Sequence, residues 1–152
     1  MNKVQSVINL RPLSQENARA VVALRVAPEQ AGFVASNANS IADAYVHREL
    51  RPLAVYAGDV LVGFAMYGED PDDGRWWVVR MMIDERFQGR GYGRGAMVAL
   101  IALMREEHQC ESIRLGVDPA NHGAIRLYES LGFRDTGEVH YDEMVMCLDC
   151  GT

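Results

Sequence analysis

A glycine-rich stretch near the middle of the chain constrains the fold more than any other feature. Residues 88–95 read Gln-Gly-Arg-Gly-Tyr-Gly-Arg-Gly, between a predicted strand, Arg75–Ile83, and a predicted helix, Gly91–His108. Glycine permits positive φ and close backbone approach, and the first N–H groups of a helix have no partner within it. With Arg90 and Arg94, these N–H groups would form a cradle for a phosphate or pyrophosphate. The alternative is a tight turn in which glycine only relieves crowding.

Two common phosphate-binding patterns do not explain this stretch. A P-loop needs Gly-Lys-Ser/Thr, whereas Lys3 is the chain's only lysine. Gly91–Ala96 matches the dinucleotide pattern GxGxxG/A, but that pattern should open the first βαβ unit of a chain. Here it follows predicted hairpin strands, and too little chain remains for the rest of a dinucleotide-binding sheet.

The first half of the chain predicts antiparallel strands and two short helices. Gly58-Asp59 is a two-residue hairpin signal, and Ser40 with Asp43 resembles a capping box. The expected elements are a strand over Val7–Leu13, a helix after Ser14, an irregular segment over Pro28–Asn39, a helix from Ser40 through Tyr45, and strands over Leu53–Ala57 and Val60–Tyr67.

The second half predicts a β-α-β crossover followed by a hairpin. Gly91–His108 is apolar almost all round, so we expect a buried helix. The other expected elements are a strand over Ser112–Val117, a helix over Asn121–Leu131 ending at Gly132, a strand from Phe133, a turn near Thr136–Glu138, and a strand over Tyr141–Leu148. A crossover makes its strands parallel, so the predicted fold is α/β (α+β), with a mixed, mostly antiparallel sheet and helices on both faces.

Length and composition limit the function classes. A chain of 152 residues is the usual size of one domain, and its net charge of −6 argues against a general nucleic-acid partner. The longest apolar run, Ala96–Met104, is far shorter than the ~20 residues of a membrane span, and the N-terminus lacks a signal-peptide pattern. We therefore expect a cytoplasmic protein without a membrane partner.

The cysteines do not predict a metal site. Cys147 and Cys150 form a CxxC, Cys110 is separate, and His140 is the only further ligand candidate nearby. A structural zinc site needs four ligands, so we expect reduced thiols and no metal.

Two motifs resemble those of the GNAT N-acetyltransferases. Gln88-x-x-Gly91-x-Gly93 resembles the family's acyl-CoA pyrophosphate motif, and Asn121-x-x-Ala124-x-x-Leu127-Tyr128-x-x-x-Gly132-Phe133 resembles the second part of its signature. Both occur in the family's order and spacing. The resemblance implies one GNAT domain over residues 1–152, a GNAT-type sheet of about six or seven strands, and acetyl-CoA as the cosubstrate.

The resemblance also implies roles for individual residues. Pantetheine would lie where Met81–Ile83 splays from Ser112–Val117, a backbone N–H near Met82 would face the thioester oxygen, and Tyr128 would protonate the leaving thiolate as general acid. Without the family, Asn121 reads as a helix N-cap and Tyr128 as a core tyrosine. The implied acetyl-CoA-binding residues are Met81, Met82, Ile83, Gln88, Gly89, Arg90, Gly91, Tyr92, Gly93, Arg94, Asn121, Ala124 and Tyr128.

A base is the harder requirement of the implied reaction. An alkyl amine has a pKa of about 10.4, so it is almost entirely protonated at neutral pH. Asp84 and Glu85 follow the central strand and are the expected catalytic carboxylates, although both could be solvated charges. Glu29 is expected to bind the acceptor, and His140 is a further candidate base.

The acceptor is expected to be a small-molecule amine. Val62–Gly68 and Ile83–Gly91 resemble the bacterial spermine/spermidine (diamine) acetyltransferase branch, which makes a polyamine the leading expectation. That branch tends to carry a carboxylate where this chain has Val79, and Arg80 beside it would favour a carboxylate-bearing amine. An amino acid, an antibiotic or a protein N-terminus stays open as the acceptor, as does a silent acetyl-CoA sensor. A homodimer is also expected from the family.

Overall fold

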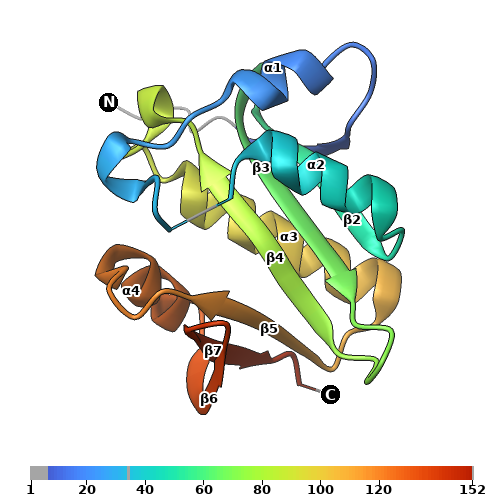
Figure 1. Ribbon diagram of the computed structural model, residues 1–152, viewed down its shortest axis with the longest axis vertical. Coiled ribbons are helices and arrows are strands. Elements are labelled where there is room, and N and C mark those ends of the chain that lie inside the picture. The colour runs from blue at the N-terminus through green and yellow to red at the C-terminus, as the bar shows by residue number, and fades with distance from the viewer. Residues whose placement is uncertain (1–6, 34, 152) are drawn as a thin grey trace.

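A seven-stranded sheet runs through the molecule in the order β1-β2-β3-β4-β5-β7-β6. The computed structural model describes residues 7–33 and 35–151 (Figure 1). Every neighbouring pair of strands is antiparallel except β4 and β5, so the predicted mixed sheet and its parallel crossover are confirmed. The elements are β1 Ile8–Pro12, α1 Ala18–Ala23, η1 Pro28–Gln30, α2 Asn37–Val46, β2 Leu50–Ala57, β3 Val60–Glu69, β4 Trp76–Ile83, η2 Glu85–Phe87, α3 Tyr92–His108, β5 Ser112–Val117, α4 His122–Ser130, β6 Arg134–His140 and β7 Glu143–Asp149.

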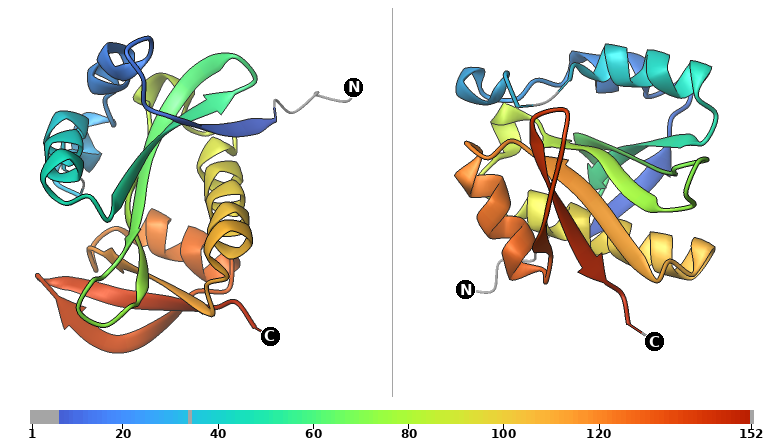
Figure 2. Two further views of the ribbon diagram at one scale, coloured as in Figure 1. Left: turned by 90° about the vertical axis from the view of Figure 1, so that its right-hand side faces the viewer. Right: turned by 60° about the horizontal axis from the view of Figure 1, so that its bottom comes forward.

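Helices cover both faces of the sheet, as Figure 2 shows: α1 and α2 lie on one face, and α3 and α4 on the other. Val21, Phe64 and Met66 belong to the apolar cluster under α1 and α2, while Met97 belongs to the cluster under α3. The expectation that α3 is buried all round was wrong. Only one side of it is buried, and Val98 remains 49% exposed.

Helix α2 begins earlier than predicted. Its N-cap is Ser36, whose Oγ accepts a hydrogen bond from the Asn39 N–H at 3.1 Å. Ser40, the predicted cap, is instead fully buried within the helix. The backbone decides between them, because an N-cap lies outside the helix with extended backbone, as at Ser36 (φ −62°, ψ 151°).

The last hairpin also turns at a different place from the one predicted near Thr136–Glu138. Those residues lie inside β6, where the register with β7 is irregular and Gly137 has φ 81°. The turn is formed by Tyr141 and Asp142, with φ of 51° and 64°. Positive φ at both central residues matches the twist of a tight hairpin, and it moves the start of β7 to Glu143.

Strands β4 and β5 pair along only part of their length. The pairs are Trp76 with Ile113, Trp77 with Arg114, and Val78 with Leu115. Within the described chain, β4 has no β5 partner after Val78, so the predicted splay of Met81–Ile83 from β5 is confirmed. Through this gap the two halves of the sheet separate.

Within residues 7–33 and 35–151, no helix has the length and apolar character needed to cross a bilayer.

Candidate active site

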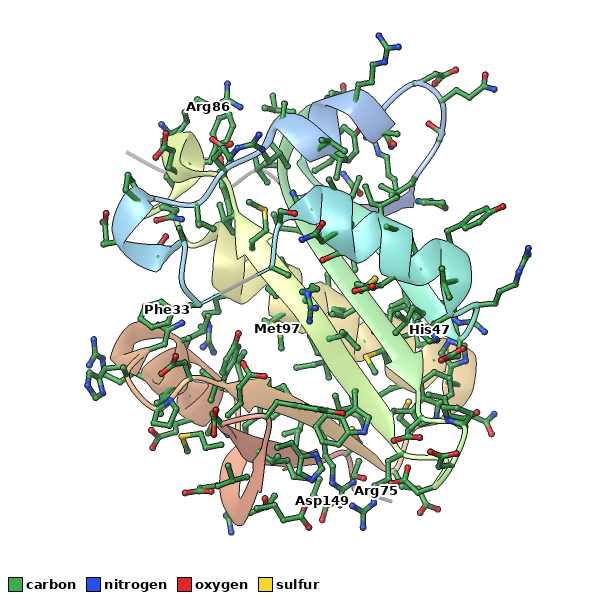
Figure 3. All side chains as sticks on the ribbon, viewed as in Figure 1. Phe33, His47, Arg75, Arg86, Met97 and Asp149 are labelled. Carbon is green, nitrogen blue, oxygen red and sulfur yellow. The ribbon has the colours of Figure 1, made fainter. Side chains whose placement is uncertain are left out.

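The separation of β4 from β5 opens a cavity of about 610 Å³, within the usual range for small-molecule sites. Its walls come from β4, β5, the turn before α3, helix α4, the segment before α2 and the first residue of β7. Phe33, which Figure 3 labels beside α4, is one of the lining residues. The cavity thus joins elements far apart in the sequence.

The glycine-rich turn forms one end of this cavity. Gly89 and Gly91 have φ of 77° and 83°, a conformation that favours glycine, and Gly91 is the N-cap of α3. The first helical bond is donated by the Gly95 N–H to Gly91 O at 3.1 Å. The preceding N–H groups, of residues 92–94, have no partner of their own within the helix, as an anion cradle requires.

The two arginines of the turn do not line the cavity. Arg94 donates a hydrogen bond to Ser130 Oγ at 2.7 Å and so connects α3 with α4. The Arg90 guanidinium lies over the Phe87 ring, 5.6 Å from its centroid. The glycines of the turn, and not these guanidinium groups, therefore line this end of the cavity.

Gln88 holds the turn in place. Its Nε2 donates to Ile83 O at 2.9 Å and to Gln30 Oε1 at 2.8 Å. These bonds connect the end of β4, the turn before α3 and η1. Gln30, which sequence reasoning did not identify, also lines the cavity.

Helix α4 supplies the opposite wall. Asn121 accepts a hydrogen bond from the Ala124 N–H at 3.3 Å, so it is an N-cap, and both residues also line the cavity. Tyr128 packs against the buried Phe133, with ring centroids 5.9 Å apart. Burial, with a smaller contribution from Glu143, raises the pKa of Tyr128 to about 12. The phenol therefore keeps its proton at neutral pH.

Three of the acidic residues expected in the site lie outside the cavity lining: Glu29, Asp84 and Glu85. Asp84 is 3% exposed, and its carboxylate accepts hydrogen bonds from the backbone N–H of Arg25 at 2.9 Å and from Nε of Arg86 at 2.7 Å. Burial alone would raise the pKa of Asp84, but these bonds lower it below its ordinary value. Figure 3 shows Arg86 at the top of the view, far from α4. Asp84 thus joins the end of β4 to the segment after α1.

Arg80 lines the cavity next to a bulge in β4. Met66 pairs with Arg80 and Tyr67 with Val78, which leaves Val79 without a partner on β3. The Arg80 side chain donates to Ser40 Oγ at 3.1 Å and to Val79 O at 2.7 Å. The buried serine of α2 therefore orients the guanidinium at the site.

Two acidic residues of the cavity lining were missed by sequence reasoning, Asp118 and Glu143, and Glu143 lies on β7. Burial raises its pKa, Arg80 lowers it and Asp118 raises it further. Glu143 stands directly before the apolar run Met144–Leu148, which was a signal in the sequence. Its position beside α4 depends on the register of β7 with β5, which the sequence does not show.

Among the described residues, no group of three or more His, Cys, Asp and Glu side chains is arranged to hold a metal ion. Cys110, Cys147 and Cys150 are all free thiols. Burial raises the pKa of Cys110 to about 11, so this thiol is a poor nucleophile at neutral pH.

Comparison with known proteins identifies the family of the chain. Residues 18–133 match the model of the acetyltransferase (GNAT) family. The chain is 37% identical over 146 residues to the spermine/spermidine N(1)-acetyltransferase of Bacillus subtilis, covering 91% of this chain and 96% of the relative. Among solved structures, spermidine N-acetyltransferase from Vibrio cholerae has a TM-score of 0.72 at 19% identity, covering 93% of this chain and 94% of that chain. PaiA N-acetyltransferase from Thermoplasma acidophilum has a TM-score of 0.70 at 16% identity, covering 93% and 98%.

The family match spans most of the chain, and the close relative covers nearly all of it. The cavity between the separating strands is lined by residues of both sequence motifs, including Gln88, Gly91 and Tyr128. The chain therefore belongs to the acetyltransferase (GNAT) family, as an acyl-CoA-dependent N-acetyltransferase.

Proposed function

We propose that the protein transfers acetyl from acetyl-CoA to a primary amine of a polyamine, with Tyr128 as the proton donor to the leaving sulfur. The observation that carries the proposal is the cavity between β4 and β5, with unpartnered helix N–H groups at one end and Tyr128 in its wall. The acceptor class is supported by the B. subtilis relative, a spermine/spermidine N(1)-acetyltransferase.

Acetyl-CoA fits the residues of the cavity. Its pyrophosphate would accept hydrogen bonds from the N–H groups of residues 92–94. The pantetheine arm would lie along the unpaired part of β4, where Met81, Met82 and Ile83 line the cavity beside Asn121 and Ala124. The Met82 N–H would stabilise charge on the thioester oxygen.

Tyr128 would act late in the reaction. A thiol has a pKa of about 8.5, well below that of Tyr128 at about 12. By these values, proton transfer from Tyr128 is uphill even to the fully formed thiolate. Tyr128 therefore first donates a hydrogen bond that stabilises the charge building on sulfur as the C–S bond breaks, and its proton moves to sulfur only after that bond is broken.

Arg80 supports a second acceptor class. Its guanidinium lines the cavity and is held by Ser40 and the backbone of Val79. A fixed positive charge attracts a carboxylate and repels a polycation. An amine that carries a carboxylate, such as an amino acid, is therefore the competing acceptor.

Thiol release from acetyl-CoA against a panel of amines tests the proposal. The panel contains spermine, spermidine, putrescine, several amino acids and an aminoglycoside. Turnover of polyamines alone would support the first acceptor class. Turnover of amino acids alone, lost selectively in Arg80→Ala, would support the second class. If no amine is turned over but acetyl-CoA raises the melting temperature, the proposed reaction is contradicted and cofactor binding stands.

We also propose a homodimer. Strand β6 lies at one edge of the sheet, and all 7 of its residues are exposed. An open strand edge can pair with a second copy of the chain. Sedimentation velocity at micromolar concentration tests this, and a monomer would contradict it.

A further inference from the structure

The Glu143 side chain lines the cavity and packs against Gly116, where a larger residue would not leave room for it. Met144 pairs with Val117 and packs into the apolar cluster under α3. Side chains alternate along a strand, so Glu143 points to the other face of the sheet. There its Oε1 lies only 2.8 Å from where a Cβ on Gly116 would be. A side chain at residue 116 would displace the carboxylate, so the glycine makes its position possible.

The Glu143 carboxylate is partly buried and has no hydrogen-bond partner among the described residues. Burial raises the pKa of Glu143, Arg80 of β4 lowers it, and Asp118 of the β5–α4 loop raises it. No hydrogen bond contributes to this shift. Tyr128 of α4 is close enough for Glu143 to raise its pKa, and His140 of β6 is the register partner of Glu143. A carboxylate can accept several hydrogen bonds, so this one can accept a donor from the cavity.

Two other carboxylates near β4 and β5 are already engaged. Asp118 also lines the cavity, but its Oδ1 accepts a hydrogen bond from the Ala120 N–H at 2.9 Å. Asp84 is held by Arg25 and Arg86 outside the lining. Of the two acidic residues in the cavity lining, Glu143 is therefore the one whose carboxylate accepts no hydrogen bond from the described residues.

We infer that Glu143 is the catalytic base that takes protons from the acceptor amine. The inference rests on the proposed function, since it names the proton acceptor of that reaction.

Glu143 takes one proton from the ammonium group and releases it to solvent, which frees the nitrogen lone pair. That pair forms the C–N bond to the thioester carbonyl carbon, and the C–S bond then breaks with its electrons on sulfur. The nitrogen loses a second proton to Glu143, while sulfur takes the Tyr128 proton. Both residues then exchange protons with solvent, so the net products are the N-acetyl amine, free CoA and one proton.

The test is Glu143→Gln, which keeps the size of the side chain and removes its basicity. With the acceptor that the amine panel identifies, kcat at pH 7.4 should fall about 100-fold or more. The deficit should shrink toward pH 10, because the free amine, with a pKa of about 10.4, then needs no base. Glu138→Gln, on the neighbouring strand β6, is the matched control and should stay within about twofold. The thermal shift caused by acetyl-CoA should be unchanged in both variants.

Two readouts can overturn the inference. A Glu143→Gln enzyme that keeps kcat within about threefold of wild type, even with a raised KM, would exclude the base role. A carbon-13 NMR titration of the glutamate carboxyl groups, assigned through Glu143→Gln, should show one group that titrates above the ordinary glutamate range. If no such group is found, the structural premise fails.

The proposed function can fail separately. If wild type turns over no amine, slow hydrolysis of acetyl-CoA, with water as the nucleophile, reports on Glu143 instead. Slower hydrolysis in Glu143→Gln than in wild type would support the base, and equal rates would overturn it.

Discussion

The two sides of the sheet gap, at its open end, place their carboxylates in opposite surroundings. At the end of β4, Asp84 is 3% exposed and held by donors from Arg25 and Arg86. At the start of β7, Glu143 is partly buried against Gly116, with no hydrogen bond among the described residues to lower its pKa. The hydrogen bonds of Asp84 stabilise its charged form and connect β4 to the segment after α1. Glu143 instead keeps the capacity to accept a proton, as the inferred base role requires. Variants of Asp84 should therefore change mainly the stability of the fold, and variants on the other side of the gap should change mainly the rate of the reaction.

The largest expected effect is on the α4 side of the gap. Tyr128→Phe removes the proton donor and should lower kcat about 100-fold or more, while melting temperature and the thermal shift with acetyl-CoA stay close to wild type. The matched control is Tyr141→Phe, because Tyr141 is 98% exposed at the hairpin turn. Steady-state kinetics with the best amine measure the effect. A Tyr128→Phe enzyme with wild-type kcat would contradict the proposed role of the phenol.

Asp84→Asn should show the reverse pattern. Losing charge-assisted hydrogen bonds should lower the free energy of unfolding by about 1–3 kcal/mol, with the exposed ion pair to Arg86 contributing little of this. Because hydrogen bonds lower the folded pKa of Asp84, this stabilisation is present above its unfolded pKa, about 3.9. It is lost as pH falls through the folded value.

Urea unfolding between pH 2 and 7 checks this prediction. Asp59→Asn is the control, because Asp59 forms an exposed pair with Arg11 at 3.2 Å. An Asp84→Asn enzyme as stable as wild type, but with a kcat as low as that of Glu143→Gln, would erase the difference between the two carboxylates. It would restore Asp84 as the candidate base.

Gly91→Ala should lower both the stability of the protein and its affinity for acetyl-CoA, with smaller effects than those of the Tyr128 and Asp84 variants. No atom lies within 4 Å of an added Cβ, so the cost comes from φ 83° alone. A left-handed alanine costs about 1–2 kcal/mol, and relaxation of the turn should raise KM for acetyl-CoA. Gly93→Ala is the comparison for stability, because its added Cβ would meet its nearest neighbour, Ile83, at an ordinary 3.8 Å. Equal unfolding free energies for the two variants would contradict the conformational argument.

The sequence predicted the local features of the site better than its long-range ones. The glycine turn, the N-cap at Asn121 and the end of α4 before Gly132 depend on neighbouring residues, and all three are found. The start of α2 was wrong because two serines compete as its cap and only backbone geometry selects Ser36.

Glu143 was missed for a different reason. Its importance depends on the register that pairs β7 with β5 and on a glycine 27 positions earlier in the chain, at residue 116. Asp84 and Glu85 were predicted as the catalytic carboxylates because they directly follow the central strand, β4, in the sequence. Sequence proximity, however, does not show that η2 turns Asp84 away from the cavity toward Arg25. Contacts of this kind depend on tertiary structure.

The smallest expected effect lies at the closed end of the gap, where β4 and β5 still pair. His108 stacks on Trp76 with ring centroids 4.2 Å apart and shares a 3.0 Å hydrogen bond with the Tyr67 hydroxyl. Burial and then Arg51 lower the pKa of His108, against the opposing effect of Glu107 and Glu69. The unfolded chain therefore binds a proton more readily, with a pKa of about 6.5.

Stability should consequently fall as pH is lowered from about 6.5 through the folded pKa of His108, below which the loss is complete. His108→Gln removes this dependence, so the difference in melting temperature between wild type and variant should narrow from pH 7.5 to pH 5. Comparing the two proteins cancels the contribution of Glu143, whose raised pKa favours the fold as pH falls. A constant difference across this range would mean that the strand pairing at the closed end tolerates a charged imidazole. The gap would then be held by its three backbone pairs and not by the aromatic cluster.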